Sequence, residues 1–301
     1  MTSSLDCLII GGGPAGLTAA IYAARFHLRV GVIDAGESRA LQIRRTHNHA
    51  GFPEGISGAE LLQRMRTQAA RYGALIDKSR VDTLQMTANG FVGTTDSGAF
   101  SAKSVIIATG VTNHRPDMSE TLHSEALQSG RLRYCPVCDG YEVTNKNVAI
   151  IGANSAAVRE AIFMKSFTRD VTFVGPQSID EAERLQLQRY GIPLVAGPAR
   201  EFALETDTIS FACGSRRYSY DAIYPALGSS IHSDLAIQLG AKVTDDTCIE
   251  VDSHQRTSVE GLYAAGDVVI GLDQISHAMG QAGVCATTVR NDLAARGRFP
   301  F

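Results

Sequence analysis

Short apolar runs that end in glycine or an acid recur along the chain. Leu5 to Ile10 runs directly into a glycine-rich turn, and a second run, Arg29 to Ile33, ends in Asp34. Such runs, bounded by turn residues, predict buried strands of a parallel sheet. Leu17 to Arg25, between the two runs, predicts a helix. The order strand, glycine turn, helix, strand predicts a βαβ unit.

The same pattern returns in the middle of the chain. Asn147 to Ile151 predicts a strand, Ser155 to Phe167 a helix, and Val171 to Val174 another strand. Ser104 to Gly110 in the first unit and Ile223 to Gly228 in the second also correspond, since both are apolar and end in glycine. The sequence therefore predicts an α/β protein with two Rossmann-like dinucleotide-binding folds, the second inserted into the first.

Polarity changes indicate the domain boundaries. Polar residues become frequent near His114 to Asp117, and Leu262 to Asp267 returns to the pattern of the first fold. We expect one domain from residues 1–115 and 240–301, and a central domain from residues 116–239. The other predicted elements are a helix at Gly58 to Tyr72, a meander at Ala74 to Leu84, Gly90 to Thr95 and Ala99 to Ser101, and a last helix from Ser276 or Gly280 to Ala295.

Composition excludes several classes of protein. The chain has 301 residues, 44% of them hydrophobic, and a formal net charge of -3, which is enough apolar material for two cores. A basic run that would indicate nucleic acid is absent from the sequence. No apolar run approaches the roughly 20 residues of a membrane helix, and the start lacks the basic region of a signal peptide. Six irregularly spaced cysteines favour a reducing, cytoplasmic location.

The turn Gly11-Gly12-Gly13-Pro14-Ala15-Gly16 carries the dinucleotide fingerprint. Gly11 makes the tight turn, Gly13 lets the backbone approach a pyrophosphate, and Gly16 allows the helix to pack closely on the strand. The helix that starts at the turn presents unpaired N–H groups and its positive dipole end to the phosphates. Asp34 is placed to hold a ribose hydroxyl. We expect the cofactor to contact Gly11, Gly13, Pro14, Ala15, Gly16 and Asp34.

A second motif, Cys135-Pro136-Val137-Cys138-Asp139-Gly140, lies just before the repeated unit. Two thiols separated by two residues can close a small disulfide ring, and in a reducing compartment such a pair is typically redox-active. Zinc would need a second ligand pair, but the remaining cysteines stand alone at Cys7, Cys213, Cys248 and Cys285. Asp139 can move the proton that thiol chemistry requires. We predict Cys135, Cys138 and Asp139 as catalytic residues, and no metal site.

In order and spacing these motifs resemble those of the low-molecular-weight thioredoxin reductases. The resemblance is carried by Gly11 to Gly16, Thr109-Gly110, Cys135 to Gly140 and Gly266-Asp267, and it covers nearly the whole chain. It implies an FAD domain built from both ends of the chain and a smaller central domain that carries the cysteines. It also implies a homodimer, a rotation between domains during turnover, and reduction of a protein disulfide such as that of thioredoxin.

The resemblance also implies a role for individual residues. Cys138 would face the flavin, Cys135 would be the interchange thiol that attacks the partner disulfide, and Asp139 would be the acid and base. Asp273 stands where the family usually has an arginine. Further FAD contacts are implied at Asn48, Thr109, Gly110, Gly266, Asp267, Gln274 and Ile275.

The repeated unit departs from the family at the nicotinamide site. Asn154 stands where the second glycine of the turn belongs, and its side chain hinders the approach of a pyrophosphate. The following strand ends in Gly175-Pro176-Gln177, without an acid for a ribose or the arginine cluster that holds the NADP phosphate in this family. NADPH is therefore not expected as the donor. The sequence looks like the NADPH-independent subgroup, whose members take electrons from ferredoxin or hold a second flavin, here a second FAD.

Several alternatives stay open at this point. The chain could be a flavin dithiol oxidase that passes electrons from a small dithiol to oxygen, or a flavin-bound redox sensor without turnover. The sequence names neither the electron donor (ferredoxin, a second flavin or weak NAD(P)H) nor the substrate, nor the direction of electron flow. A ferredoxin partner would require a basic docking patch, for which the candidates are Arg131, Arg133, Arg216 and Arg217.

Overall fold

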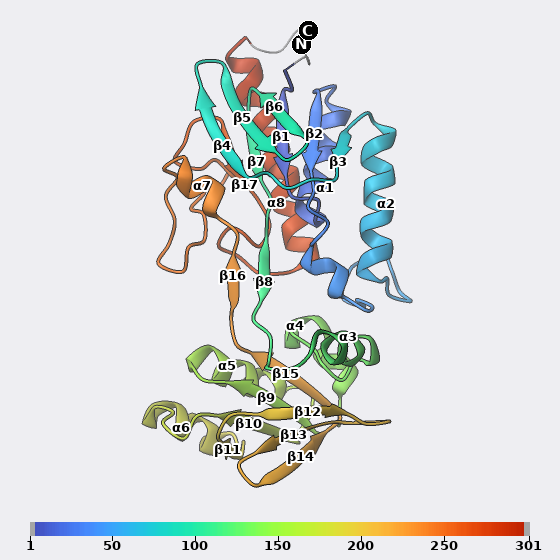
Figure 1. Ribbon diagram of the computed structural model, residues 1–301, viewed down its shortest axis with the longest axis vertical. Helices are drawn as coiled ribbons and strands as arrows, with labels where there is room; N and C mark the ends of the chain where they lie inside the picture. The colour runs from blue at the N-terminus through green and yellow to red at the C-terminus, as the bar shows by residue number, and fades with distance from the viewer. Residues whose placement is uncertain (1–3, 298–301) are drawn as a thin grey trace. The chain divides into compact units, whose positions relative to one another are not determined.

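The computed structural model describes residues 4–297, which divide into two compact units (Figure 1). The first contains the described residues up to Arg45, His49–Thr112 and those from Ser230 on, and the second contains Thr46–Asn48 and Asn113–Ser229. The chain crosses between them in β8 (Val111–Asn113) and β16 (Ser229–Ile231), which pair with each other. The second unit is therefore inserted into the first, as the repeat predicts. Within the described part of the chain, no helix is long and apolar enough to cross a membrane.

A five-stranded parallel sheet with the order β17-β7-β1-β2-β3 forms the centre of the first unit. An antiparallel meander of three strands, β4 to β6, accompanies it. The strands are β1 (Cys7–Ile10), β2 (Val30–Ile33), β3 (Leu75–Asp77), β4 (Thr83–Thr87), β5 (Gly90–Thr95), β6 (Gly98–Ala102), β7 (Val105–Ile107) and β17 (Leu262–Ala264). The helices are α1 (Pro14–Arg25), α2 (Gly58–Arg71), α7 (Asp234–Gln238) and α8 (Ile275–Ala295), with a 3-10 turn η1 (Arg39–Gln42).

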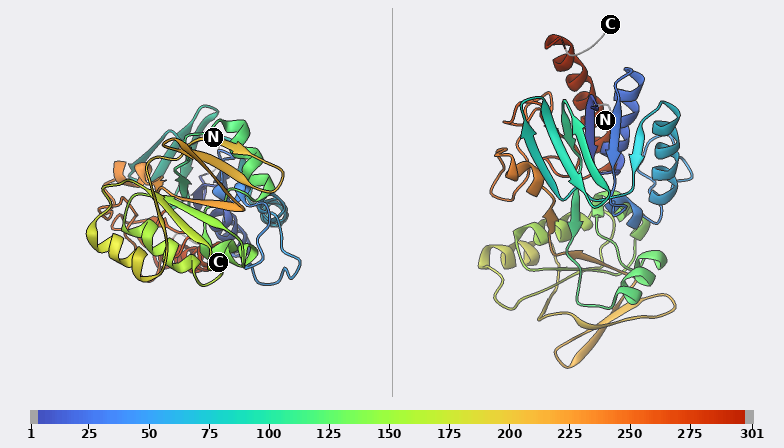
Figure 2. Two further views of the ribbon diagram at one scale, coloured as in Figure 1. Left: turned by 90° about the horizontal axis from the view of Figure 1, so that it is seen from below. Right: turned by 45° about the horizontal axis from the view of Figure 1, so that its top comes forward.

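Both faces of this sheet are covered, which explains why its strands are apolar throughout. Because successive side chains point to opposite faces, Cys7 and Ile9 of β1 pack with the helices α1 and α8, whereas Leu8 and Ile10 pack with the meander. The right-hand view of Figure 2 shows the meander strands, coloured teal, on the sheet. The unit thus has three layers: meander, parallel sheet and helices.

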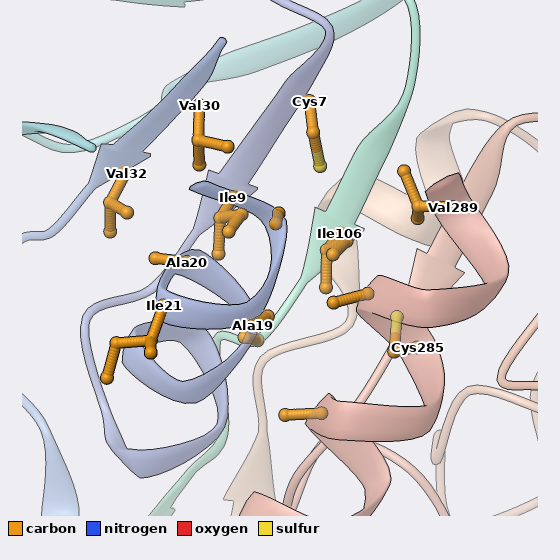
Figure 3. Close-up of a cluster of buried hydrophobic side chains, with 14 of the residues drawn as sticks. Cys7, Ile9, Ala19, Ala20, Ile21, Val30, Val32, Ile106, Cys285 and Val289 are labelled. Carbon is orange, nitrogen blue, oxygen red and sulfur yellow. The ribbon is translucent and has the colours of Figure 1, made fainter. Parts of the chain in front are cut away.

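Small side chains line the contact between the sheet and its helices. Figure 3 shows Ala19 and Ala20 of α1, together with Cys285 of α8, among the side chains of β1, β2 and β7. Cys7 and Cys285 are both fully buried. Burial raises the pKa of Cys7 to about 12 and the pKa of Cys285 well above its usual value. Both thiols are therefore packing residues of low reactivity.

The second unit repeats this architecture around a four-stranded parallel sheet with the order β11-β10-β9-β15. Its strands are β9 (Val148–Gly152), β10 (Val171–Gly175), β11 (Leu194–Ala196) and β15 (Ala222–Ala226), and a second meander consists of β12 (Arg200–Leu204), β13 (Ile209–Cys213) and β14 (Arg216–Tyr220). Its helices are α3 (Glu120–Ser129), α4 (Pro136–Asp139), α5 (Ser155–Met164) and α6 (Glu181–Arg189), with a 3-10 turn η2 (Gly140–Val143). Pro225 lies in the edge strand β15, where a missing N–H is tolerated.

Alternation again assigns each face of the second sheet to a different layer. Val148 and Phe173 pack with α5 and α6, while Ala149 and Ile223 pack with the second meander. Helix α3 contributes Ala126 to the meander side. The layer order matches that of the first unit, with the addition of α3, and the two Rossmann-like folds predicted from the sequence are confirmed.

One predicted meander strand belongs elsewhere. The run from Ala74 to Leu84 was expected to be part of the meander, but its first half forms β3, which pairs with β2 in parallel. Helix α2 precedes β3, so the chain makes a second crossover and returns in the same direction as β2. Only the last residues, from Thr83 on, enter the meander. The second meander, β12 to β14, was not predicted.

Asp6, which directly precedes β1, forms hydrogen bonds with residues near the starts of β2 and β7. Its carboxylate accepts hydrogen bonds from the backbone N–H of Arg29 at 2.9 Å and from Nζ of Lys103 at 2.7 Å. Arg29 lies just before β2, and Lys103 lies between β6 and β7. Burial raises the pKa of Asp6, but the hydrogen bonds from Lys103 and Arg29 outweigh burial and leave the pKa below its usual 3.8. The ionised carboxylate therefore stabilises the fold.

We expect Asp6→Asn to lower the free energy of unfolding by about 1–3 kcal/mol at pH 7, because it leaves charged donors without their anion. Since the folded pKa of Asp6 is lowered, the difference from the unsubstituted protein persists above pH 4 and shrinks as the pH falls through the folded pKa. Urea unfolding at several pH values measures this difference. Asp96→Asn, at an exposed position of the meander, is the control and should have little effect. An unchanged urea midpoint for Asp6→Asn would contradict the assignment.

Candidate functional site

The predicted cysteine pair forms a disulfide. Cys135 and Cys138 are bonded, with their Cα atoms 5.2 Å apart. Cys135 is the N-cap of the short helix α4, and the N–H of Cys138 donates to Cys135 Sγ at 3.2 Å. Pro136 supports the helix start because its ring fixes the backbone in a helical conformation and its missing N–H is not needed there. Both cysteines are half-buried, which leaves them accessible to exchange.

Asp139, at the end of α4, has two hydrogen-bond donors that the sequence analysis did not identify. Arg133 Nη1 donates to Oδ2 at 2.8 Å, and the hydroxyl of Tyr224 donates to Oδ1 at 3.0 Å. Burial raises the pKa of Asp139, and the charge of Arg133 opposes this rise. The carboxyl group of the residue that follows Cys138 is thus oriented by two donors, as a proton-transfer group must be.

The remaining cysteines do not join this centre. Cys7, Cys213, Cys248 and Cys285 are free thiols, and Cys248 is the least buried of them. In residues 4–297 no group of three or more His, Cys, Asp or Glu side chains could hold a metal ion.

The glycine turn after β1 is packed so closely that side chains are excluded. A Cβ on Gly11, whose φ is +109°, would lie 2.2 Å from the carbonyl oxygen of Ala108, and a Cβ on Gly16 would lie 1.9 Å from the carbonyl oxygen of Gly11. Gly13 is the N-cap of α1, and Pro14 occupies the first turn. No side chain caps this helix, so its first N–H groups point toward the expected cofactor.

Three further expected contacts lie against this turn: Asp34, Thr109 and Gly266. A Cβ on Gly12 would lie 2.3 Å from the carboxylate of Asp34, and one on Gly266 would lie 2.8 Å from Cβ of Ala15. The turn also touches the end of β7, where Thr109 and Gly110 follow Ala108. The hydroxyl of Thr109 donates to the carbonyl of His232. Residues far apart in the sequence therefore form one cradle around the start of α1.

The acids of the cradle are paired with arginines. Asp34 Oδ2 accepts from Arg66 Nη2 at 2.6 Å, and Asp267 Oδ2 accepts from Arg39 Nη2 at 2.7 Å. Nη1 of Arg39 lies 3.2 Å from Oδ2 of Asp273. Burial raises the pKa of Asp267, and Arg39 lowers it. The family resemblance implies an arginine at position 273, where this chain has Asp273. Arg39 contributes a guanidinium next to this position.

These residues fit a flavin dinucleotide. Gly11 to Gly16 leave backbone room and N–H groups for a pyrophosphate, and Asp34 and Asp267 can accept from sugar or ribityl hydroxyls. Gln274 directly precedes α8, and Ile275 is its first residue. Thr46–Asn48 groups with the second unit, and the hydroxyl of Thr46 donates to Oδ1 of Asn48 at 2.8 Å.

In the corresponding turn of the second unit, the side chain of Asn154 caps the helix that follows. Oδ1 of Asn154 accepts from the N–H of Ala157 at 3.0 Å and caps α5. One of the N–H groups that would bind a pyrophosphate is therefore already used. Arg184, which is isolated in the sequence, donates to the carbonyl of Gln177 at 2.8 Å in the loop after β10. It is engaged with the backbone there, and no acid ends β10.

The arginines considered for a ferredoxin patch are largely engaged. Arg131 lies 3.3 Å from Asp207, Arg133 pairs with Asp139, and Arg217 donates to Ser210. These three arginines therefore have partners within the second unit.

Comparison with known proteins agrees with this geometry. The family model described as pyridine nucleotide-disulphide oxidoreductase matches residues 5–282. A thioredoxin reductase of Treponema pallidum (strain Nichols) is 33% identical over 282 residues, which cover 89% of this chain and 90% of that protein. The solved thioredoxin reductase of Streptococcus pyogenes MGAS5005 is 25% identical, with a TM-score of 0.89 over 98% of this chain and 100% of that one.

A further solved structure, that of HlmI, has the same fold, with a TM-score of 0.89 at 24% identity over 99% of this chain and 96% of its own. The match to the family model spans both units and includes the glycine turn and the disulfide. The chain therefore belongs to the pyridine nucleotide-disulphide oxidoreductase family and is a flavin disulfide oxidoreductase of the thioredoxin-reductase type.

Proposed function

We propose that this enzyme reduces a protein disulfide, such as that of a thioredoxin, through Cys135 and Cys138. The observation that carries the proposal is the Cys135–Cys138 disulfide, which is followed directly by the half-buried, oriented acid Asp139. The thioredoxin reductases among its relatives support a disulfide protein as the partner. We further propose a cytoplasmic homodimer, in which residues 1–115 and 240–301 bind FAD and residues 116–239 carry the cysteines.

The chain's own residues divide the chemistry between them. FAD, when bound, supplies the two electrons that open the disulfide. Cys135 is the interchange thiol, whose thiolate attacks the partner disulfide through a mixed disulfide, and Cys138 is the thiol that resolves it and faces the flavin. Asp139 accepts and returns the proton. The residues that would hold FAD are Gly11, Gly13, Pro14, Ala15, Gly16, Asp34, Asn48, Thr109, Gly110, Gly266, Asp267, Gln274 and Ile275.

We propose that the electron donor is not NADPH. The side chain of Asn154 caps α5 where the family binds a pyrophosphate, and the loop after β10 offers neither an acid nor an arginine cluster. A ferredoxin is a donor that needs no pyrophosphate at this turn. A second FAD in the central domain, the other candidate donor, would have to place its own pyrophosphate away from Asn154. A dithiol oxidase would use the same cysteines with oxygen as acceptor, and a sensor would show no turnover.

We expect Cys135→Ser to abolish reduction of a thioredoxin disulfide, because the nucleophile of the exchange is lost. Cys248→Ser is the matched control, since Cys248 is a partly exposed free thiol outside the disulfide, and it should leave turnover unchanged. Single-turnover assays with reduced, FAD-loaded protein and excess oxidised thioredoxin measure the rate at which the thioredoxin disulfide is reduced. Turnover by Cys135→Ser at the unsubstituted rate would show that Cys135 is not the interchange thiol.

We expect the flavin spectrum to stay oxidised during an anaerobic titration with NADPH. Photoreduced ferredoxin should bleach the flavin absorbance if ferredoxin is the donor. A count of two flavins per chain would identify a second flavin as the donor. Rapid bleaching by NADPH would refute the assignment based on Asn154. Oxygen consumption with a small dithiol would identify the oxidase.

We expect Arg39→Met to weaken FAD binding by about tenfold or more, since hydrogen bonds to charged groups contribute about 1.5–3 kcal/mol. Arg39 orients Asp267, whose carboxylate oxygens would accept hydrogen bonds from hydroxyl groups of the cofactor. The dissociation constant, from calorimetric titration of deflavinated protein with FAD, measures the effect. Arg64→Met, on the exposed face of α2, removes an arginine paired with Glu60 and should leave FAD affinity unchanged. Equal affinities for the two variants would exclude Arg39 from the cofactor site.

A further inference from the structure

Asp139 is held by two donors from different parts of the second unit. Oδ2 accepts from Arg133 Nη1 at 2.8 Å, and Oδ1 accepts from the hydroxyl of Tyr224 at 3.0 Å. The hydroxyl also lies 3.3 Å from the backbone carbonyl oxygen of Asp139. Each carboxylate oxygen thus has its own donor, and rotation of the group would break both bonds. We call Arg133, Asp139 and Tyr224 the carboxylate clamp.

The backbone positions both donors of the carboxylate clamp. The N–H of Ile223 donates to the carbonyl of Arg131 at 2.8 Å, and the N–H of Arg133 donates to the carbonyl of Ile223 at 3.0 Å. These bonds attach residues 131–133 to the edge strand β15, on which Tyr224 follows Ile223. Nε of Arg133 also donates to the carbonyl of Gly130 at 2.9 Å. The guanidinium and the phenol are therefore fixed relative to each other.

The carboxylate clamp balances opposing effects on the charge of Asp139. Burial raises the pKa of Asp139, while the charge of Arg133 and the hydrogen bonds from Arg133 and Tyr224 lower it, and Glu142 raises it. Tyr224 is fully buried. Burial and the neighbouring carboxylate raise the pKa of Tyr224, so its hydroxyl stays a donor at neutral pH. The side chain of Arg133 is 16% exposed, so solvent screens its charge only weakly.

We propose that Arg133 and Tyr224 are positioning residues: they orient Asp139, which accepts the proton of the reduced cysteine pair, and they compensate the negative charge of its carboxylate. This inference rests on the proposed function, because it requires Cys135 and Cys138 to cycle between disulfide and dithiol. Reduction breaks the S–S bond with two electrons and, with one proton taken up, leaves one thiol and one thiolate. The proton of the thiol passes to Asp139, and Arg133 acts on the cysteine pair only through the carboxylate that it contacts.

The pH profile of thiol alkylation tests this directly. FAD-loaded protein is reduced with dithiothreitol, and the rates at Cys135 and Cys138 with iodoacetamide are followed by peptide mass spectrometry from pH 5 to 10. Arg133→Met leaves the negative charge of Asp139 uncompensated. The pH midpoint of the alkylation rate should therefore rise by about one pH unit. Below the midpoint, the rate should fall about tenfold. Tyr224→Phe retains the ring and should give a smaller rise in the same direction. Arg133→Lys retains the charge and should restore most of the profile.

The matched control is Arg131→Met. Arg131 lies on the same segment, but its guanidinium lies 3.3 Å from Asp207 and makes no hydrogen bond to Asp139. Its profile should equal that of the unsubstituted protein, and an equal shift in both arginine variants would overturn the proposal. If Arg133→Met does not fold, the comparison of Tyr224→Phe with Tyr220→Phe, a buried tyrosine of β14, decides the same question.

The Asp139→Asn background shows whether the two residues act through the acid. There, Arg133→Met and Tyr224→Phe should no longer raise the midpoint. A full shift in that background would mean that Arg133 acts on the thiols directly, and the proposal would be wrong. The assay needs neither electron donor nor protein substrate. The expected profiles in a protein that reduces no disulfide protein would support the carboxylate clamp while contradicting the proposed function.

Discussion

Each parallel sheet is covered on both of its faces, and this constraint decides where functional groups can lie. Apolar side chains of the strands fill both layers of the first unit. Polar groups are therefore placed where the strands end, and parallel strands end at one common edge. Gly11 follows β1, Asp34 follows β2, Thr109 follows β7 after Ala108, and Gly266 follows β17 after Ala265. The cofactor cradle is a consequence of the sheet rather than of any local motif alone.

The second unit has the same layers, but different groups lie at the ends of its parallel strands. At the end of β9, Asn154 caps the next helix with its own side chain. At the end of β10, a Cβ on Gly175 would lie 2.4 Å from the carbonyl oxygen of Gly152, so the two strand ends pack directly on each other. The redox centre lies instead after the segment that pairs with the free edge of β15. The two units thus share an architecture but carry their candidate functional residues at different edges of their sheets.

Local features of the structure were predictable from the sequence, and long-range ones were not. The glycine turn and the Cys135–Cys138 disulfide depend on residues within six positions of one another, so both can be recognised in the sequence. The placement of β3 was mistaken because a short strand carries no signal of its direction, which the crossover through α2 sets. Arg39 and Tyr224 were missed for a related reason: Arg39 meets Asp267, and Tyr224 meets Asp139, across long stretches of chain. Arg133 lies only six residues before Asp139, but no motif marks it as the partner of that acid.

The acids that the motifs identify share one physical requirement. A carboxylate taken out of water is strongly disfavoured unless a cation or several donors replace its hydration. Each of the three has an arginine from another element at hydrogen-bond distance: Arg66 for Asp34 at 2.6 Å, Arg133 for Asp139 at 2.8 Å, and Arg39 for Asp267 at 2.7 Å. For Asp139 and Asp267, burial still raises the pKa against the arginine.

These arginines therefore keep Asp139 and Asp267 oriented and offset part of the effect of burial on their pKa. A family motif specifies the acid, because its place on the backbone is local. Which residue supplies the arginine is decided by the three-dimensional packing, so two members of the family can share every motif and still differ in the electrostatics of their sites. In this chain Asp273 stands at the position of an expected arginine, and Arg39, from the loop after β2, brings a guanidinium to the same group of carboxylates.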